Sequence, residues 1–132
     1  NPPFFAEGSV QRPTQTVRDR ANVQPQGALD VWVRFMVHAL RPGGTATLIH
    51  RADALAELLA CFENRFGGLI VRPILPRANA SAHRILVTGI KGARSPLSIS
   101  PPLVLHEADG SPTSEVAAIL NDGAPLRMRP QD

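Results

Sequence analysis

The sequence is poor in two residue types that often carry chemistry. Cys61 is the only cysteine among the 132 residues, and Lys91 is the only lysine. A single cysteine excludes an internal disulfide and a cysteine-based metal site. Cys61 lies among apolar residues in a helical pattern, which favours a small buried side chain. The four histidines are dispersed, with no pair four residues apart, so the sequence predicts no metal site.

Long apolar runs are also missing. No run approaches the length of a membrane-spanning helix, and no segment resembles a signal peptide. We therefore expect a cytoplasmic protein with no membrane partner. The hydrophobic content of 43% is enough for a buried core. The length suits one modest domain or a large piece of one.

The positive charge comes almost entirely from arginine. The net charge is +3 and the pI is about 10.4. Arginine binds phosphate in a bidentate manner and stacks on bases, which favours a nucleic acid as the partner. A chain rich in Arg, Ala and Pro also follows from a GC-rich genome, so composition alone leaves both explanations open.

The clearest helical pattern covers residues 28–41. Its apolar residues recur at i, i+3 and i+4, and Val31 and Phe35 widen the apolar surface. The pattern predicts a helix buried on more than one side, with Trp32 and Phe35 in the core. Pro42-Gly43-Gly44 is expected to end it.

The following segments alternate between strand and helix patterns. The pattern predicts a buried strand over 45–50, then an amphipathic helix over 53–66 with Asp53 as N-cap and Gly67 as its stop. This order is typical of an α/β unit with a parallel sheet. Two more strands are predicted at 69–75, interrupted by Pro73, and at 85–90. The connection between them is too short for a crossover helix, which predicts an antiparallel pair. A last short helix is expected near 113–120.

The opening tetrapeptide Asn1-Pro2-Pro3-Phe4 is unusual. Two prolines stiffen the backbone and supply no N–H, while their carbonyls and the Asn1 amide remain available as acceptors. Phe4 adds a flat apolar face. This combination suits a planar group that carries an amino function. The alternative is a proline-rich start to an ordinary loop.

Several motifs occur together in an order that resembles a known family. The tetrapeptide is followed by a helix ending in Leu40-Arg41-Pro42-Gly43-Gly44, then by a strand, a helix and a predicted antiparallel pair. This resembles the C-terminal half of a class I S-adenosylmethionine-dependent methyltransferase. Further similarity to the bacterial tRNA(Val) adenine N6-methyltransferase family lies in Leu48-Ile49-His50-Arg51, in Ile90-Lys91-Gly92, and in Pro101 to His106 before a Thr-x-Glu helix.

The resemblance implies an α/β fold and a bound cofactor. Residues 1–132 would form the C-terminal part of one Rossmann-like domain, with the end of the fourth strand, the fifth strand, an antiparallel sixth and seventh pair, and flanking helices. The cofactor would be S-adenosylmethionine. The Gly-rich loop that binds it in this family is not in the sequence, so we expect the N-terminal cofactor-binding half to be absent, and the cofactor-binding residues stay unknown.

The resemblance also implies roles for the first five residues. The Asn1 side-chain oxygen and the Pro2 carbonyl would accept hydrogen bonds from an exocyclic amine, and Phe4 would stack on the base. Pro3 would hold the backbone rigid. Phe5 would line the base pocket or pack in the core.

A basic rim is expected beyond the strand ends. In open α/β sheets the ligand lies beyond the carboxyl ends of the parallel strands. Arg51, Arg77, His83 and Arg84 are predicted near that edge, where they would suit RNA phosphates. The alternative is that they are solubilising surface charges.

The leading functional expectation is methyl transfer to the exocyclic amine of adenine in tRNA. The motif also occurs in methyltransferases that act on protein glutamine or on guanine of rRNA. A third alternative is a non-catalytic remnant that binds RNA or a partner. If these residues were the whole chain, the open edge of the sheet would favour self-association.

Overall fold

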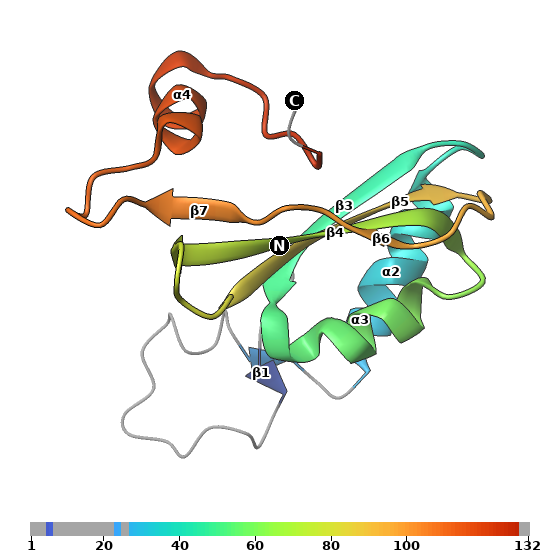
Figure 1. The fold of residues 1–132 in the computed structure, drawn as a ribbon. Helices are drawn as coiled ribbons and strands as arrows, with labels where there is room; N and C mark the ends of the chain where they lie inside the picture. Colours follow the sequence, from blue (N-terminus) through green and yellow to red (C-terminus); the bar gives the residue numbers. More distant parts are fainter. Residues whose placement is uncertain (1–4, 7–22, 25–26, 130–132) are drawn as a thin grey trace.

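The computed structural model describes residues 5–6, 23–24 and 27–129, and the elements within them form a sheet with helices on both faces (Figure 1). The short strands β1 and β2 pair with each other in parallel and form a separate ladder. The helices and strands are β1 (Phe5–Ala6), β2 (Val23–Gln24), α2 (Ala28–Ala39), β3 (Thr45–Arg51), the 3₁₀ helix η1 (Ala52–Ala54), α3 (Leu55–Phe62), β4 (Phe66–Arg77), β5 (Arg84–Lys91), β6 (Ser98–Ile99), β7 (Leu103–His106) and α4 (Ser114–Asp122).

The main sheet is mixed. Its strand order is β3-β5-β4-β6, and β7 also pairs with β4. β5 runs antiparallel to both of its neighbours, so β3 and β4 point in the same direction with β5 between them. β6 and β7 follow one another along the far side of β4 and are parallel to it. The α/β class and the antiparallel pairing of the two predicted strands are confirmed, whereas the expected parallel sheet is replaced by a mixed one.

The core lies between the sheet and the α2–α3 layer. Leu58 and Phe62 of α3, Val33 of α2 and Val87 of β5 have no exposed surface. Burial of side chains of this size contributes roughly 1.5–3 kcal/mol each. The periodic apolar residues of both helices therefore attach them to one face of the sheet.

The outer side of α2 differs from the prediction. Leu29 and Val33 are buried, but Trp32 is 46% exposed and Phe35 is 63% exposed. The expectation that Trp32 and Phe35 lie in the core is therefore wrong for the described residues. One stripe of the helix is enough to cover the sheet, and the surplus apolar side chains face away from it. Val31, at 65% exposure, belongs to the same outer side.

The segment predicted as one helix over 53–66 is shorter and has two parts. η1 precedes α3, and α3 ends at Phe62. Asp53 lies within η1 and does not cap α3, whose N-cap position is Ala54. Gly67 is not a helix stop but part of β4, where a Cβ atom would lie 2.1 Å from the carbonyl oxygen of Ala93. A close approach of two backbones, and not a helix end, explains this glycine.

β4 is longer than predicted and continues through Pro73. The strand pairs with β6 at Ile70 and Val71, and with β7 from Ile74 onward. Pro73 falls in the gap between these two partners. Proline is tolerated in a strand where no ladder hydrogen bond is required. The proline therefore marks the change of partner and does not interrupt the strand.

Arg72 fastens the C-terminal segment to the other face of the sheet. It is fully buried, its Nη2 donates to Glu115 Oε2 at 2.9 Å, and its Nη1 lies 2.8 Å from Glu115 Oε1. Nη1 also donates to the carbonyl oxygen of Arg127 at 2.6 Å. The predicted short helix is confirmed as α4, with Thr113 as N-cap and Gly123 in the left-handed conformation at its end.

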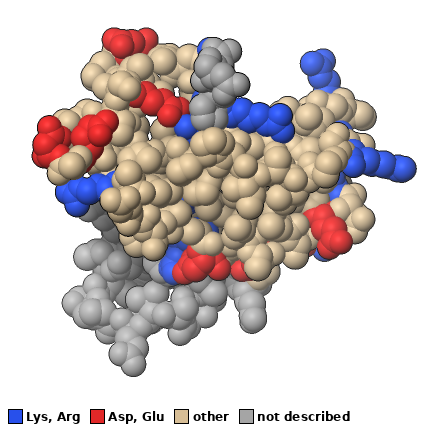
Figure 2. All heavy atoms as spheres, in the orientation of Figure 1, with Lys and Arg blue, Asp and Glu red and all other residues tan. Residues whose placement is uncertain are grey.

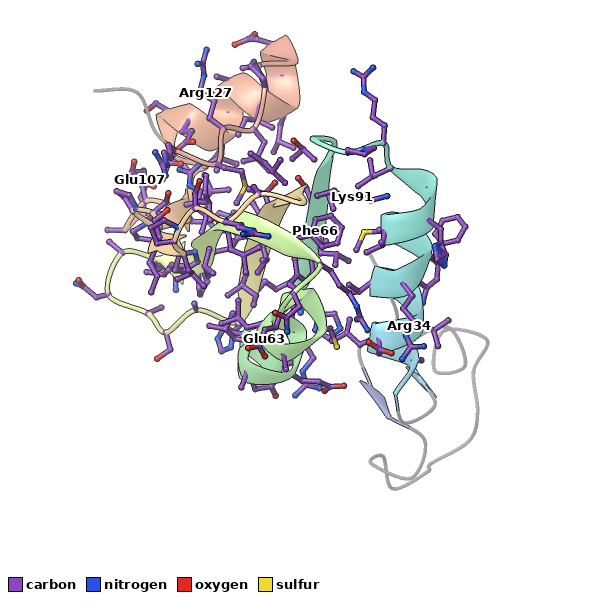
Figure 3. All side chains as sticks on the ribbon, turned by 90° about the vertical axis from the view of Figure 1, so that its right-hand side faces the viewer. Arg34, Glu63, Phe66, Lys91, Glu107 and Arg127 are labelled. Atoms are coloured by element: carbon purple, nitrogen blue, oxygen red, sulfur yellow. The ribbon has the colours of Figure 1, made fainter. Side chains whose placement is uncertain are left out.

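Lys91 joins the end of β5 to the end of α2. Its Nζ donates to the carbonyl oxygens of Val37 at 2.6 Å and Leu40 at 2.7 Å. Figure 3 shows its side chain reaching from the sheet toward the C-terminal end of α2. Backbone hydrogen bonds also link Lys91 to Gly43 and Gly44. The Pro42-Gly43-Gly44 and Ile90-Lys91-Gly92 motifs thus form one structural unit.

Candidate substrate-binding edge of the sheet

The opening motif falls outside the described residues. This applies to Asn1, Pro2, Pro3 and Phe4. Phe5 is described in its backbone only, as the first residue of β1, where it pairs with Val23. The roles assigned to these five residues therefore remain predictions.

The strand ends place three predicted arginines at one edge. β3 ends at Arg51 and β4 ends at Arg77. Because these strands point in the same direction, both ends lie at the same edge of the sheet, which we call the carboxyl edge. β5 begins there, at Arg84. The topological part of the prediction is confirmed, while a substrate-binding role for these arginines stays a prediction.

Arg51 and Arg84 form a cross-strand pair, here called the arginine pair. They are directly opposite in the register of β3 and β5. Opposite residues share a face of the sheet, with Cβ atoms about 5 Å apart. The hydroxyls of Thr47 and Thr88, which are opposite on the same face, lie 3.0 Å apart and show the same alignment.

Asp53 holds the guanidinium of Arg51. Nε of Arg51 donates to Oδ1 of Asp53 at 2.9 Å, and Nη2 forms an ion pair with Oδ2. These hydrogen bonds are the main cause that lowers the pKa of Asp53 below its ordinary value of 3.8. The Asp53 carboxylate is therefore ionised at neutral pH. It fixes the plane of one guanidinium of the arginine pair.

Arg77 is at a different corner of the carboxyl edge. Its partner in the register is His106 of β7, whereas the partner of Arg84 on β4 is Ile74. Figure 2 shows positive side chains that lie apart from one another on the face of the molecule that it presents, with acidic side chains beside several of them. For the described residues, the predicted rim thus consists of the arginine pair and a separate Arg77. His83 contributes a carbonyl oxygen, which accepts from the Ala52 N–H at 3.1 Å.

His50 is a buried titratable residue near the carboxyl edge, and its burial was not predicted from the sequence. It is 3% exposed and lies one residue before Arg51. Ala46 and Leu48 are buried at the alternate positions of the same strand, so His50 continues the row that faces α2 and α3. That alternation was visible in the sequence and is the signal that would have placed His50 inside. Its charge contributes, as a minor cause, to the lowered pKa of Asp53.

The described residues bring together no three His, Cys, Asp or Glu side chains that would hold a metal ion. In the same part of the chain, no helix combines the length and apolarity needed to cross a bilayer. Burial raises the pKa of the half-buried Cys61 thiol, which makes it a weak nucleophile.

No family model matches this sequence, and no curated protein matches it. The fold is nevertheless methyltransferase-like. A solved structure described as a predicted O-methyltransferase, protein Atu636 from Agrobacterium tumefaciens, superposes with a TM-score of 0.73 and 32% identity. The match covers 86% of this chain and 61% of that chain, so this chain spans about three-fifths of the length of the protein it resembles.

Proposed function

We propose that this chain is the catalytic-motif part of an S-adenosylmethionine-dependent methyltransferase that acts on the exocyclic amine of adenine in tRNA. One observation carries the proposal: Asn1-Pro2-Pro3-Phe4 precedes a methyltransferase-like fold in the same chain. In this proposal residues 1–132 are the C-terminal half of a Rossmann-like domain. The fold supports methyl transfer at a coarse level, and the tetrapeptide supports a nitrogen acceptor.

The tetrapeptide suits the chemistry of a conjugated amine. The lone pair of such an amine is delocalised into the ring, which makes the nitrogen a poor nucleophile. Acceptors at the Asn1 side-chain oxygen and the Pro2 carbonyl would bind the two amino hydrogens and draw the nitrogen toward tetrahedral geometry. Phe4 would stack on the base, which must leave its own stack to reach the site. S-adenosylmethionine, when bound, supplies the electrophilic methyl group.

Positioning would account for most of the rate enhancement. When the nitrogen acquires the methyl group, it loses one proton, and water can accept that proton without a strong general base. Holding the amine in line with the methyl donor lowers the entropic part of the barrier. Pro3 would contribute by keeping the backbone on either side rigid.

Oxygen is the second candidate acceptor, because the superposed protein is described as a predicted O-methyltransferase. A hydroxyl acceptor has to lose its proton, which calls for a general base and not for two hydrogen-bond acceptors. Protein glutamine and rRNA guanine remain alternative nitrogen acceptors. The tetrapeptide indicates that the methyl acceptor is a conjugated nitrogen, but it does not indicate which molecule carries that nitrogen.

The test uses the intact protein with labelled S-adenosylmethionine and unmodified tRNA, rRNA and protein extract as acceptors. We expect the label in tRNA, as N6-methyladenosine after digestion to nucleosides. Asn1→Ala should reduce incorporation by at least about 100-fold, the scale on which loss of such donors or acceptors acts. Asn121→Ala, at an exposed position of α4, is the matched control and should leave activity unchanged. Label on a ribose hydroxyl would favour the oxygen acceptor and contradict the proposal.

A further inference from the structure

Two neighbouring features, the outer side of α2 and the side of β3 that faces away from β5, are here called the α2–β3 face. The face consists of the side chains of Val31, Trp32 and Phe35 and the backbone of β3 from Thr45 to Ile49. We propose that it is an interface inside the intact protein, where a segment of the same polypeptide from outside residues 1–132 adds a strand to β3 and covers the apolar side chains. This occupant rests on the proposed function, in which residues 1–132 are one half of a domain.

The exposed apolar side chains of α2 are contiguous. Val31 is 65% exposed and Phe35 is 63% exposed, four residues apart, and Trp32, at 46%, is three residues from Phe35. Residues at these spacings are neighbours on a helix surface. Single exposed apolar side chains are normal in proteins, whereas a contiguous group marks a surface that another element covers. The two aromatic side chains supply most of its area, since each can bury roughly 150–250 Å².

Trp32 lies on the side of α2 that faces away from α3. The opposite side is defined by Asp30, which accepts from Arg65 at the end of α3 and pairs with Arg34 on its own helix. Trp32 is two residues from both Asp30 and Arg34, which is about 200° around the helix. Phe62 of α3 packs on β5, and residues 40–44 join α2 directly to β3. Trp32 therefore faces the side of the molecule where the sheet ends at β3.

β3 offers backbone groups to a further strand. It is the last strand in the sheet order, and its one ladder partner among the described residues is β5. The Lys91 N–H donates to the Gly44 carbonyl oxygen at 2.8 Å, so Gly44 and every second residue after it face β5. Thr45, Thr47 and Ile49 therefore direct their N–H and C=O groups away from β5. Such a row of backbone groups is a template for pairing with another strand.

β3 from Thr45 to Ile49 lacks the features that normally protect an exposed strand. Natural edge strands are short, or carry Lys, Pro or a bulge that prevents pairing with another chain. β3 is seven residues long, and its first five residues contain no proline and no charged side chain. Ala46 and Leu48 are both 4% exposed, so the strand is anchored in the core. These properties favour a strand that is paired on both sides in the intact protein.

A segment of the same polypeptide suits both parts of the α2–β3 face. The backbone groups of a strand pair in a ladder only with another peptide backbone, which RNA does not provide. The match to the superposed protein covers 61% of that chain, so about two-fifths of its length has no counterpart in residues 1–132. A strand beside β3, with its connection passing over the sheet, would also bury Trp32 and Phe35 next to the layer formed by α2 and α3.

The experiment places the photoreactive amino acid p-benzoyl-L-phenylalanine in place of Phe35 in the intact protein and identifies the cross-linked peptide by mass spectrometry. We expect an intramolecular link to a peptide outside residues 1–132, with a yield that stays constant on dilution by about tenfold. The same amino acid in place of Asn121, an exposed residue of α4, is the matched control and should give no such link. A link to a second copy, to added tRNA or to a peptide within residues 1–132 would overturn the inference.

A smaller side chain and the backbone of β3 give two further measurements on the intact protein. In a chain whose other cysteines are replaced by serine, the thiol of Phe35→Cys should react with a maleimide at least about tenfold more slowly than that of Asn121→Cys, because it is covered. The Thr47 N–H should exchange with deuterium at least about 100-fold more slowly than a free amide, as the Leu48 N–H does on the β5 side. Equal thiol reactivities, or a Thr47 amide that exchanges at the free rate, would overturn the inference.

Failure of the interface and failure of the proposed function give different results. If Phe35→Cys reacts freely while the intact protein still forms N6-methyladenosine in tRNA, only the interface is wrong. If the α2–β3 face is covered by a segment outside residues 1–132 but no methyl group reaches tRNA, the interface stands and the proposed substrate is wrong.

Discussion

At the scale of single residues, Lys91 connects two motifs that are distant in the sequence. Its ammonium group caps two carbonyl oxygens at the end of α2, at Val37 and Leu40. A positive charge at a helix C-terminus also interacts favourably with the helix dipole. The only lysine of the chain therefore has a local structural role, and its position is set by the turn at Gly43 and Gly44.

Lys91→Met should lower the free energy of unfolding by about 2 kcal/mol, because two charge-assisted hydrogen bonds are lost while the apolar part of the side chain is kept. Urea unfolding followed by circular dichroism measures the change. Arg94→Met, at a nearby exposed position, is the control and should have little effect. A Lys91→Met variant as stable as the control would show that water satisfies those carbonyls equally well.

Helical spacing predicted the buried residues on one side of α2 correctly. It could not predict which of the remaining apolar residues stay exposed, because that depends on how α2 packs on the sheet. The buried positions Leu29 and Val33 follow from helical spacing. Trp32 and Phe35 are equally apolar, yet which apolar side chains remain outside depends on how much of the helix the sheet can cover. Hydrophobicity alone does not contain that information.

At the scale of elements, an ion-pair cluster joins α2 to the end of α3. Asp30 accepts from Arg65 Nη1 at 2.5 Å and pairs with Arg34 Nε at 2.7 Å. Arg65 also donates to the carbonyl oxygen of Cys61 at 2.8 Å. The hydrogen bond from Arg65 is the main cause that lowers the pKa of Asp30 below its ordinary value of 3.8.

This cluster predicts a pH dependence with a definite sign. A carboxyl whose folded pKa is lowered stabilises the fold above its unfolded pKa and loses that contribution as the pH falls through the folded pKa. Asp30→Asn should therefore be less stable than the native chain at pH 7, and the difference should shrink as the pH drops below about 3.8. Urea midpoints at several pH values test this, with Asp122→Asn as the matched substitution control. A difference that stays constant with pH would contradict the assignment.

The link between β4 and α4 gives a second prediction at this scale. Glu115→Ala leaves the buried guanidinium of Arg72 without its carboxylate, although the carbonyls of Pro101 and Arg127 still accept from it. We expect a loss of about 2–3 kcal/mol, below the usual cost for a buried pair because the Glu115 side chain is 42% exposed. Hydrogen exchange should show α4 losing protection first. Glu107→Ala removes an exposed carboxylate that follows β7 and is the control. If Glu115→Ala and Glu107→Ala had the same stability and the same protection of α4, the contact between Arg72 and Glu115 would not hold α4 to the sheet.

Element boundaries could be predicted only in part. The two central strands and their antiparallel pairing followed from alternation and from the short connection. Pro73 suggested an interrupted strand, because a sequence does not show that β4 changes partner at that point. Gly67 suggested a helix stop, because the approach of Ala93 arises from a segment far along the chain.

At the scale of the whole molecule, the mixed sheet, the two helical layers and the superposed structure define a methyltransferase-like fold. The placement of Arg51, Arg77 and Arg84 at one edge was predictable, because parallel strands must end together. The formation of a pair by only two of them was not, since it depends on the register of β3 and β5. The tRNA substrate and the cytoplasmic location stay predictions.

The central claim is tested most directly by nucleoside analysis of tRNA after incubation with the intact protein and labelled S-adenosylmethionine. The account predicts that the label elutes as N6-methyladenosine and that Asn1→Ala removes it, while Asn121→Ala does not. Label that persists in the Asn1→Ala variant, or that appears on a ribose hydroxyl, would contradict the account.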